Sequence, residues 1–163
     1  PHDVFPEEFV TFLLTDGAIR EPFLRYHRDL VDAGWWQATQ AVVRADAEQT
    51  VLTMPHAINY NHKHTVFGGS IALGATACGW AMVHTVFPEA AGNIVIQQGE
   101  TRYLRPADGD LTIITHGAAA QDWTALREMF ERRGKGKIEL KTEVFSNGVL
   151  AAVFEAKYVA IKG

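Results

Sequence analysis

The hydrophobic pattern of the chain is dominated by one stretch, residues 62–88, with the sequence HKHTVFGGSIALGATACGWAMVHTVFP. From His64 to Pro88 it contains no Asp, Glu, Lys or Arg, and a helix that is apolar all round is buried on all sides. Small residues recur on one face with helical spacing, at Gly68, Ala72, Ala75 and Gly79. A backbone can approach such a face closely. We therefore predict one long buried helix that ends before Pro88.

A membrane span is the alternative interpretation of this stretch, because its length would just suffice to cross a bilayer. Four glycines, His84, the threonines and the lack of a basic flank beyond Lys63 favour the buried helix instead. The composition therefore favours a helix inside a globular domain.

Alternating and β-branched residues predict strands on both sides of this helix. A hairpin precedes it, and two strands and a final hairpin follow it, at residues 37–45, 50–54, 94–104, 111–117, 138–145 and 149–161. The pair Asn147-Gly148 suits the type I′ turn of the last hairpin. Two short helices are predicted in residues 5–33, and a further helix over 121–132 is expected as a surface insertion. The resulting class is α+β, with an antiparallel sheet curled around one central helix.

Length and composition narrow the class of protein. A chain of 163 residues is expected to form one domain, here a core over 37–163 preceded by a helical extension over 1–36. A formal net charge of -4 gives no general attraction to nucleic acid or anionic membranes. The single cysteine, Cys78, suits a reducing, cytoplasmic compartment and is expected to be a buried thiol. Because the chain begins with Pro1 rather than Met, the sequence leaves open whether another domain precedes it.

Two motifs carry a resemblance to a known family. The run from Asn61 to Ser70 (NHKHTVFGGS) resembles the loop-to-helix motif of hotdog-fold thioesterases, and residues 101–106 (TRYLRP) resemble one of their strands. Over residues 37–162 the chain is most similar to the thioesterase-like domain found at the C-terminus of some bacterial acetyltransferase-like proteins. The resemblance implies a hotdog fold and a homodimer, leaving a dimer of dimers open. It also implies acyl-thioester sites between one subunit's helix and the other's sheet.

Thioester hydrolysis needs a polarised carbonyl, an activated water and a slot for the acyl group. Gly68 and Gly69 at a helix start can supply the first, because N–H groups of a first turn lack intrahelical partners and carry the positive end of the helix dipole. The alternative is that these glycines only permit tight packing of helix against sheet.

The usual catalytic carboxylates of the resembled thioesterases are missing. Relatives of the His-Gly-Gly kind have a histidine where this chain has Phe67 and a carboxylate where it has Thr76. Another kind has an aspartate in the loop, but no acid occurs between Met54 and Pro88. The base must therefore come from another residue.

Three residues are candidates for activating water or holding the carbonyl: Asn61, His64 and Glu100. Asn61 matches the loop amide of the family, and the near-neutral pKa of histidine makes His64 a possible general base. Glu100 is either a base or one half of an ion pair with Arg102 on a half-buried strand. No metal or other cofactor is expected, because no cysteine or acid completes a ligand set with His62 and His64.

The basic residues Arg132, Arg133 and Lys135 are candidates for binding the phosphates of coenzyme A or of a phosphopantetheine arm. The alternative is a solubilising turn. Phe67 and Thr76 are candidates for lining the acyl slot, although packing is the default explanation for both, within the core for Phe67 and along the helix for Thr76.

These features predict a homodimeric thioesterase that hydrolyses an acyl-CoA or acyl-carrier-protein thioester. The main alternative is a non-catalytic acyl-CoA or acyl-carrier binding module that has lost its acid. A hotdog dehydratase is a less favoured alternative. Its chemistry requires a histidine paired with an acid at a helix start, and no such pair is evident in this sequence.

Overall fold

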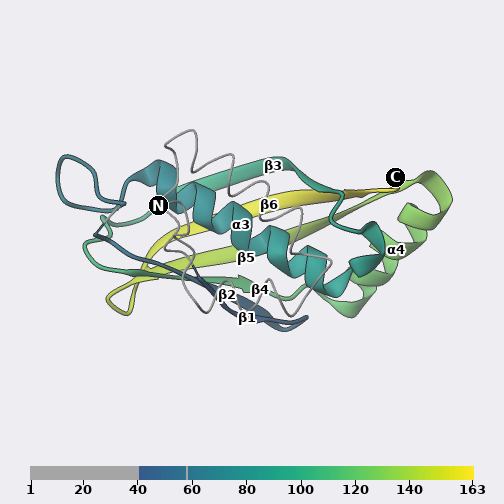
Figure 1. Ribbon diagram of the computed structural model, residues 1–163, viewed down its shortest axis with the longest axis horizontal. Helices are drawn as coiled ribbons and strands as arrows, with labels where there is room; N and C mark the ends of the chain where they lie inside the picture. Colours follow the sequence, from purple (N-terminus) through teal and green to yellow (C-terminus); the bar gives the residue numbers. More distant parts are fainter. Residues whose placement is uncertain (1–40, 58) are drawn as a thin grey trace, which may run out of the picture.

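The computed structural model describes residues 41–57 and 59–163, so the two helices predicted in residues 5–33 lie outside the described part. The elements follow one another as β1 (Ala41–Ala45), β2 (Gln49–Met54), α3 (Gly68–Val86), the short 3₁₀ helix η1 (Pro88–Ala90), β3 (Ile94–Tyr103), β4 (Leu111–His116), α4 (Ala120–Arg133), β5 (Lys135–Ser146) and β6 (Val149–Ile161) (Figure 1).

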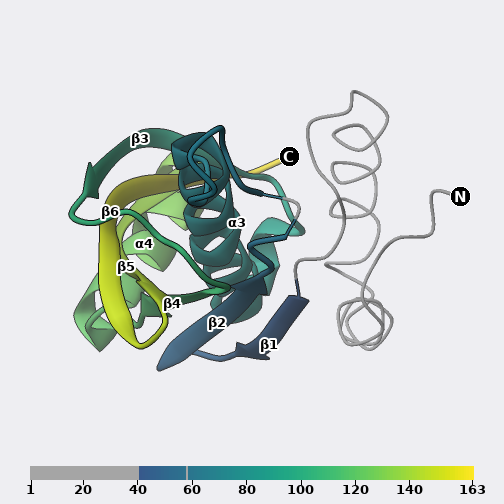
Figure 2. The same cartoon turned by 90° about the vertical axis from the view of Figure 1, so that its left-hand side faces the viewer.

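The six strands form one antiparallel sheet in the order β1-β2-β4-β5-β6-β3. The sheet curls around α3, which lies in its concave face (Figure 2). The predicted α+β class, with an antiparallel sheet around one long helix, is therefore confirmed. Within the described residues, no helix combines the length and hydropathy that a membrane crossing requires.

Two glycines of α3 allow the helix to lie against the sheet. A Cβ at Gly79 would be 2.7 Å from Cζ of Tyr158, and one at Gly74 would be 2.6 Å from Cδ1 of Ile113. The Tyr158 hydroxyl also donates to the carbonyl oxygen of Thr76 at 2.9 Å, which fixes β6 to the helix. Between these contacts, Cys78 is fully buried, as predicted, and its Sγ donates to the Thr50 carbonyl at 3.3 Å.

The helix is less enclosed than its composition predicts. Leu73, Thr76 and Trp80 are only half-buried, and they share one side of α3 because their spacing follows the helical repeat. The prediction of burial on all sides is therefore wrong for this side.

Helix α4 is more than a surface insertion. Its side chains Trp123, Leu126 and Phe130 are buried, and the Phe130 ring meets Phe87 edge-on with 4.9 Å between ring centres. The spacing of three and four residues between these apolar positions puts them on one face of the helix. Helix α4 thereby closes the end of the core at which α3 terminates (Figure 1).

Strand β3 forms one edge of the sheet and differs from its expected half-buried state. From Val95 to Tyr103 every residue of the strand except Thr101 is exposed. Its only sheet neighbour is β6, so its outer backbone edge faces no described strand.

Candidate functional site

A cavity of about 320 Å³ lies against the first turn of α3. Its walls come from the loop before the helix, from the helix itself and from the segment that follows β3. They consist of Thr65, Val66, Gly68, Ile71, Tyr103, Leu104, Arg105, Pro106 and Ala107. The backbone N–H of Val66 donates to the Ala107 carbonyl at 2.7 Å and joins the two walls. The two motifs that carry the family resemblance thus meet at one cavity.

The helix start supplies free backbone donors beside this cavity. The N–H groups of Ser70 and Ile71 donate to the Phe67 carbonyl at 2.9 and 3.2 Å. Within the described part of the chain, the N–H groups of Gly68 and Gly69 have no such acceptor. No acidic residue occupies the first turn. The positive end of the helix dipole therefore carries no acidic partner in the first turn, and the oxyanion role of the two glycines stays a prediction.

Tyr103 is a site residue that sequence reasoning missed. Its hydroxyl donates to the Gly68 carbonyl at 2.9 Å, and its ring carbon Cε1 would lie 3.2 Å from a Cβ at Gly68. The residue belongs to the TRYLRP motif, but only the sheet register shows that its side chain faces α3 rather than the outer surface. The available signal was its alternation with Arg102 along the strand.

Asn61 organises the loop that leads to the cavity. Its Oδ1 accepts from the N–H groups of Lys63 at 2.9 Å and Thr65 at 3.3 Å, and its Nδ2 donates to Oγ1 of Thr65 at 3.1 Å. An asparagine that bonds to backbone groups two and four residues ahead mimics a turn. The amide thus holds Thr65 in the cavity wall.

His64 lies one residue before the cavity wall and does not line it. It is exposed, its backbone is left-handed with φ of 61°, and its carbonyl accepts from Nε2 of His56 at 2.5 Å. Its ring stacks on Tyr60 with 5.4 Å between centres, and Tyr60 stacks in turn on His56 at 5.9 Å. This stack holds the His64 side chain beside the loop.

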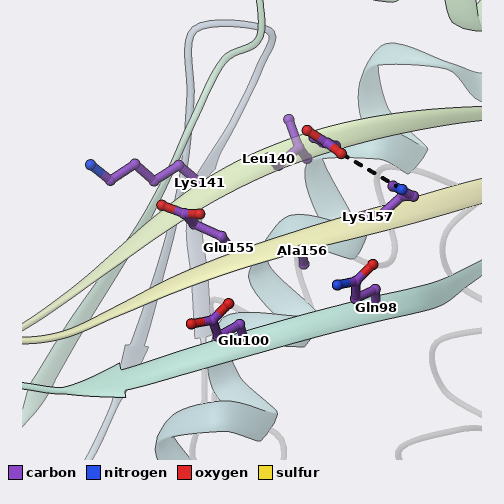
Figure 3. Close-up of a pocket in the computed structure, with 8 residues that line it drawn as sticks. Gln98, Glu100, Leu140, Lys141, Glu155, Ala156 and Lys157 are labelled. Carbon is purple, nitrogen blue, oxygen red and sulfur yellow. Dashed lines mark ion pairs between the residues drawn. The ribbon is translucent and has the colours of Figure 1, made fainter.

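Glu100 is not brought to the cavity within one chain. It lies on the outer face of the sheet, in a groove of about 300 Å³ whose labelled residues are drawn in Figure 3. There it stands directly opposite Glu155 of β6, whereas Lys157 pairs with Glu139 at 3.7 Å. Among the described residues no ion pair joins Glu100 to Arg102, so the expected pair is absent.

The basic residues lie at the other end of the molecule. Arg133, Lys135 and Lys137 line a cleft of about 260 Å³ together with Gln97, Met129, Gly136 and Val159, and Arg132 adjoins it in α4. Val159 of β6 lines this cleft, whereas Ala152 of β6 is paired with Tyr103 at the helix-start cavity. Seven residues of strand separate the two, so the cleft and the cavity lie about 23 Å apart at 3.3 Å per residue. Within the described ranges these cations form no ion pair, so their charge is open to a ligand.

Two predicted binding residues have local partners. Oγ1 of Thr76 donates back to the Ala72 carbonyl at 2.8 Å, about two turns after the start of the helix. Phe67 is 55% exposed, and its ring lies over Gly69 rather than in the cavity wall. Neither side chain lines the cavity at the helix start.

Solved structures with a similar architecture include a "putative thioesterase" from Shewanella oneidensis. It is 26% identical, with a TM-score of 0.71 over 90% of this chain and 99% of that one. A protein of unknown function from Chlorobaculum tepidum is 22% identical, with a TM-score of 0.75 over the whole of both chains. A "probable thioesterase" from Pseudomonas aeruginosa is 22% identical, with a TM-score of 0.68 over 86% and 96%. The last two likenesses establish the fold alone.

The N-terminal segment has different relatives. Residues 1–56 match the kinase domain of isocitrate dehydrogenase kinase/phosphatase (AceK). The protein of that name from Azoarcus sp. is 43% identical over 61 residues, which are 37% of this chain and 10% of that protein. The one from Aromatoleum aromaticum is 59% identical over 44 residues, which are 27% and 7%. The chain thus spans a tenth or less of these relatives.

The remainder of the chain matches one family. Residues 38–162 match the family described as "Putative thioesterase (yiiD_Cterm)". This range contains the sheet, the central helix, the helix-start cavity and the basic cleft. This match covers more than half of the sequence and agrees with the resemblance carried by the loop-to-helix motif. The chain therefore belongs to this thioesterase family.

Proposed function

We propose that the protein is a hotdog-fold hydrolase of acyl-CoA or acyl-carrier-protein thioesters that acts as a homodimer. The observation that carries the proposal is the cavity of about 320 Å³ at the start of α3, with the free N–H groups of Gly68 and Gly69 beside it. Membership of a thioesterase family supports the reaction type.

In the proposed reaction the thioester carbonyl enters this cavity with its oxygen toward the helix start. Negative charge develops on that oxygen as water attacks the carbonyl carbon. Fixed N–H donors stabilise such charge, and removing one donor of an oxyanion hole typically costs about 100- to 1000-fold in rate. The thiol then leaves and takes up a proton as the carboxylic acid forms.

His64 is proposed to take the proton from the attacking water. Its ring rests on Tyr60, so it reaches the cavity by rotating off this stack. Asn61 is proposed to support the reaction by keeping Thr65 in the wall. Glu100 stays a prediction, because its carboxylate lies on the outer face of the sheet.

The carrier half of the substrate is proposed to bind through phosphate. The cleft with Arg133, Lys135 and Lys137 offers three cations in a chain whose formal net charge is -4. Phosphate oxygens of coenzyme A or of a phosphopantetheine arm are suited to such a cluster, because hydrogen bonds between charged groups are stronger than neutral ones.

The homodimer is proposed on the free edge of β3. Eight of the ten residues of this strand are exposed, and among the described strands only β6 pairs with it. A free strand edge with exposed apolar residues is a site for adding a strand of another chain.

The direct test is a thiol-release assay on short, long and aromatic acyl-CoAs and on carrier-protein thioesters. Gly69→Val should lower hydrolysis at least tenfold, because its branched side chain crowds the donors at the helix start. A Cβ at Gly69 meets only the exposed ring of Phe67, so the fold should tolerate the change. Ala120→Val, at the first residue of the exposed start of α4, is the matched control. Equal activity of the two variants would contradict the assignment.

One observation favours the alternative of a binding module. None of the nine residues that line the cavity is Asp, Glu or His, so no base touches the cavity itself. A non-catalytic module would release no thiol from any substrate of the panel while binding coenzyme A in calorimetry.

A further inference from the structure

Charge is distributed unevenly over the outer face of the sheet. The basic cleft of about 260 Å³ lies at one end of this face, where Arg133, Lys135 and Lys137 line it. None of the seven residues that line the cleft is acidic. Among the described residues, none of the three cations has an ion-pair partner. Like charges gathered in this way repel one another unless an anion offsets them.

An acidic groove follows the basic cleft along the same strands. This groove of about 300 Å³ contains the carboxylates of Glu100, Glu139 and Glu155, and Figure 3 shows Glu100 and Glu155 pointing out from neighbouring strands. Glu139 is two residues from Lys137 on one face of β5, which is about 6.6 Å at 3.3 Å per residue. The cationic surface therefore ends close to the cleft.

Two lysines of the groove reduce its negative charge without removing it. Lys157 pairs with Glu139 at 3.7 Å, whereas Lys141 forms no ion pair with any described residue. Glu100 and Glu155 stand opposite each other on β3 and β6, and neither has an ion-pair partner in the described part of the chain. The groove holds three carboxylates against two amines, so it stays acidic beside the basic cleft.

This pattern limits the size of an anionic partner. A standard protein interface buries about 800 Å² on each side, which corresponds to a patch roughly 30 Å across. Glu155 stands opposite Lys141, four residues along β5 from Lys137 and therefore about 13 Å away. A protein surface that is acidic enough to be attracted by the cleft would meet the carboxylates of the groove as well. Like charges facing each other across an interface oppose binding.

The end of α4 accounts for only part of the basic cluster. The helix ends at Arg133, and a cation in the last turn complements the negative end of the helix dipole. Lys135 and Lys137 belong to β5 instead, and both side chains are exposed. Neither a helix end nor an ion pair among the described residues explains them, so their position favours an external anion.

The neutral walls of the cleft suit a nucleobase. Met129 of α4 and Val159 of β6 are half-buried, and a thioether packs well against an aromatic ring. Gln97 is the residue of β3 that has no paired residue in β6, because the register shifts there. Such a bulge re-aims a side chain, and here the side chain lines the cleft. A glutamine amide can bond to the edge of adenine with a donor and an acceptor at once.

Coenzyme A has a counterpart for each of these groups. Its nucleotide end combines adenine, a 3′-phosphate and a 5′-diphosphate in one small molecule. An arm on a carrier protein offers one phosphodiester and no base, and it is attached to a protein surface. The cations, the apolar walls and the amide of the cleft therefore all find partners in coenzyme A, but not in a carrier-protein arm.

We propose that the basic cleft is a nucleotide site that selects coenzyme A thioesters over carrier-protein thioesters, an inference that rests on the proposed function. Arg133, Lys135 and Lys137 hold the phosphates. Gln97 and Met129 hold the adenine. The acidic groove beside the cleft disfavours a protein carrier.

Calorimetry with adenosine 3′,5′-bisphosphate tests the phosphate contacts without hydrolysis. The wild-type protein should bind it about tenfold more tightly than adenosine 5′-monophosphate, because one charge-assisted contact is lost with the 3′-phosphate. Lys137→Ala should weaken binding of the bisphosphate by a similar factor. Lys141→Ala is the matched control, since that lysine lies on the same face of β5 but lines the acidic groove. Equal affinity for the two nucleotides, or equal losses in the two variants, would overturn the site.

Two neighbouring glutamines provide a test of the base contact. Gln97→Leu should weaken binding of adenosine 3′,5′-bisphosphate several-fold and leave binding of inorganic pyrophosphate unchanged. Gln98→Leu is the control, because Gln98 lines the acidic groove rather than the cleft. The same effect from both variants would overturn the contact between Gln97 and the base.

Selectivity is tested with one acyl group on two carriers. The kcat/KM of the wild-type protein should favour the coenzyme A thioester over the carrier-protein thioester at least about tenfold, which corresponds to one lost charge-assisted contact. Glu139→Gln/Glu155→Gln should narrow this ratio by raising the carrier-protein rate, while the bisphosphate still binds. Equal rates on both carriers in the wild-type protein would overturn the selectivity. An unchanged ratio in the double variant would overturn the role of the groove.

The nucleotide site and the proposed hydrolysis can fail separately. If the wild-type protein binds adenosine 3′,5′-bisphosphate but releases no thiol from either carrier, the proposed function is refuted and the nucleotide site stands. If thiol is released from acyl-CoA but the bisphosphate neither binds nor competes, the nucleotide site is refuted and the hydrolase stands.

Discussion

The Tyr103 hydroxyl donates a hydrogen bond of 2.9 Å to the Gly68 carbonyl, so the last residue of β3 holds the first residue of α3. This hydrogen bond therefore fixes the end of the edge strand to the start of the helix. A change at Tyr103 therefore acts directly on the helix start that borders the cavity.

Removing this hydroxyl should loosen the helix start. Tyr103→Phe keeps the ring beside Gly68 and deletes only the bond, which should cost about 0.5–1 kcal/mol of unfolding free energy because the side chain is 55% exposed. Thioester hydrolysis should fall by several-fold as the donors lose their position. Tyr60→Phe is the matched control, because the Tyr60 hydroxyl bonds to no described residue. Equal kinetics and equal urea midpoints for both variants would refute this role.

A methyl group at Gly79 should destabilise the core. Its Cβ would collide with the Tyr158 ring, 2.7 Å from Cζ, and break the hydrogen bond to Thr76. Overpacking of this kind costs about 1–3 kcal/mol, which exceeds the gain in helix propensity of about 1 kcal/mol. Gly69→Ala is the control, since only the exposed Phe67 ring must move there. Thermal unfolding should show a lower midpoint for Gly79→Ala than for Gly69→Ala.

Two substitutions of Asn61 separate loop order from direct contact with substrate. Asn61→Ala removes the acceptor for the Lys63 and Thr65 N–H groups, and turnover should fall at least about tenfold. Asn61→Asp keeps an oxygen in that place and should retain most activity if the loop is what matters. If aspartate is as damaging as alanine, the amide N–H itself is required, either for its bond to Oγ1 of Thr65 or for contact with the substrate.

Burial of Cys78 should make stability fall at alkaline pH. Desolvation raises the pKa of this thiol from 9.0 to about 11. Between these values the unfolded chain loses the proton and the folded chain keeps it, so unfolding becomes easier as pH rises from about 9 to 11. The thiol contributes about 2 to 3 kcal/mol to this fall, at 1.36 kcal/mol per pKa unit.

Cys78→Ser provides the comparison, because its hydroxyl can still donate to Thr50 but does not ionise in this range. Urea unfolding at several pH values should give a shallower alkaline decline for the serine variant. Burial also raises the pKa of Tyr158, but that effect is common to both proteins. Parallel declines would show that the thiol is not responsible.

The basic cleft should determine the affinity for phosphate-bearing substrate. Arg133→Glu/Lys135→Glu should raise KM for acyl-CoA at least tenfold and flatten its salt dependence, because phosphate contacts are screened by ions. Lys162→Glu is the control, since that amine already pairs with Glu131 at 3.4 Å. Similar KM values for the cleft variant and the control would show that the phosphates bind elsewhere.

Local signals in the sequence were sufficient for most elements of the fold. The charge-free run before Pro88 predicted α3, and Asn147-Gly148 correctly marked the turn between β5 and β6. The position of β3 at an edge could not be predicted, because it depends on pairing with β6, about 50 to 65 residues later, rather than on its own residues. The buried face of α4 was visible as Trp123, Leu126 and Phe130, but its charges outweighed that signal.

The candidate site was predictable only where function coincides with a helix start. Gly68 was found because glycine before an apolar run indicates both a helix start and close approach of a ligand. Tyr103 was missed and Glu100 was placed in the site because the two lie on opposite faces of one strand. Only the register against β6 shows which of them faces the helix.

The long hairpin of β5 and β6 extends from the Lys135–Ile161 pair to the Ser146–Val149 pair, with one register shift, between Val144 and Phe145. It reaches from the basic cleft to the end of the sheet where α3 begins. Two hydrogen-bonded strands do not stretch, so they hold the basic cleft and the helix start at a fixed separation. In the proposed function, a thioester with its carbonyl at the helix start and its phosphates in the basic cleft would have to span this fixed length, so the reach of its flexible arm would decide which substrates fit.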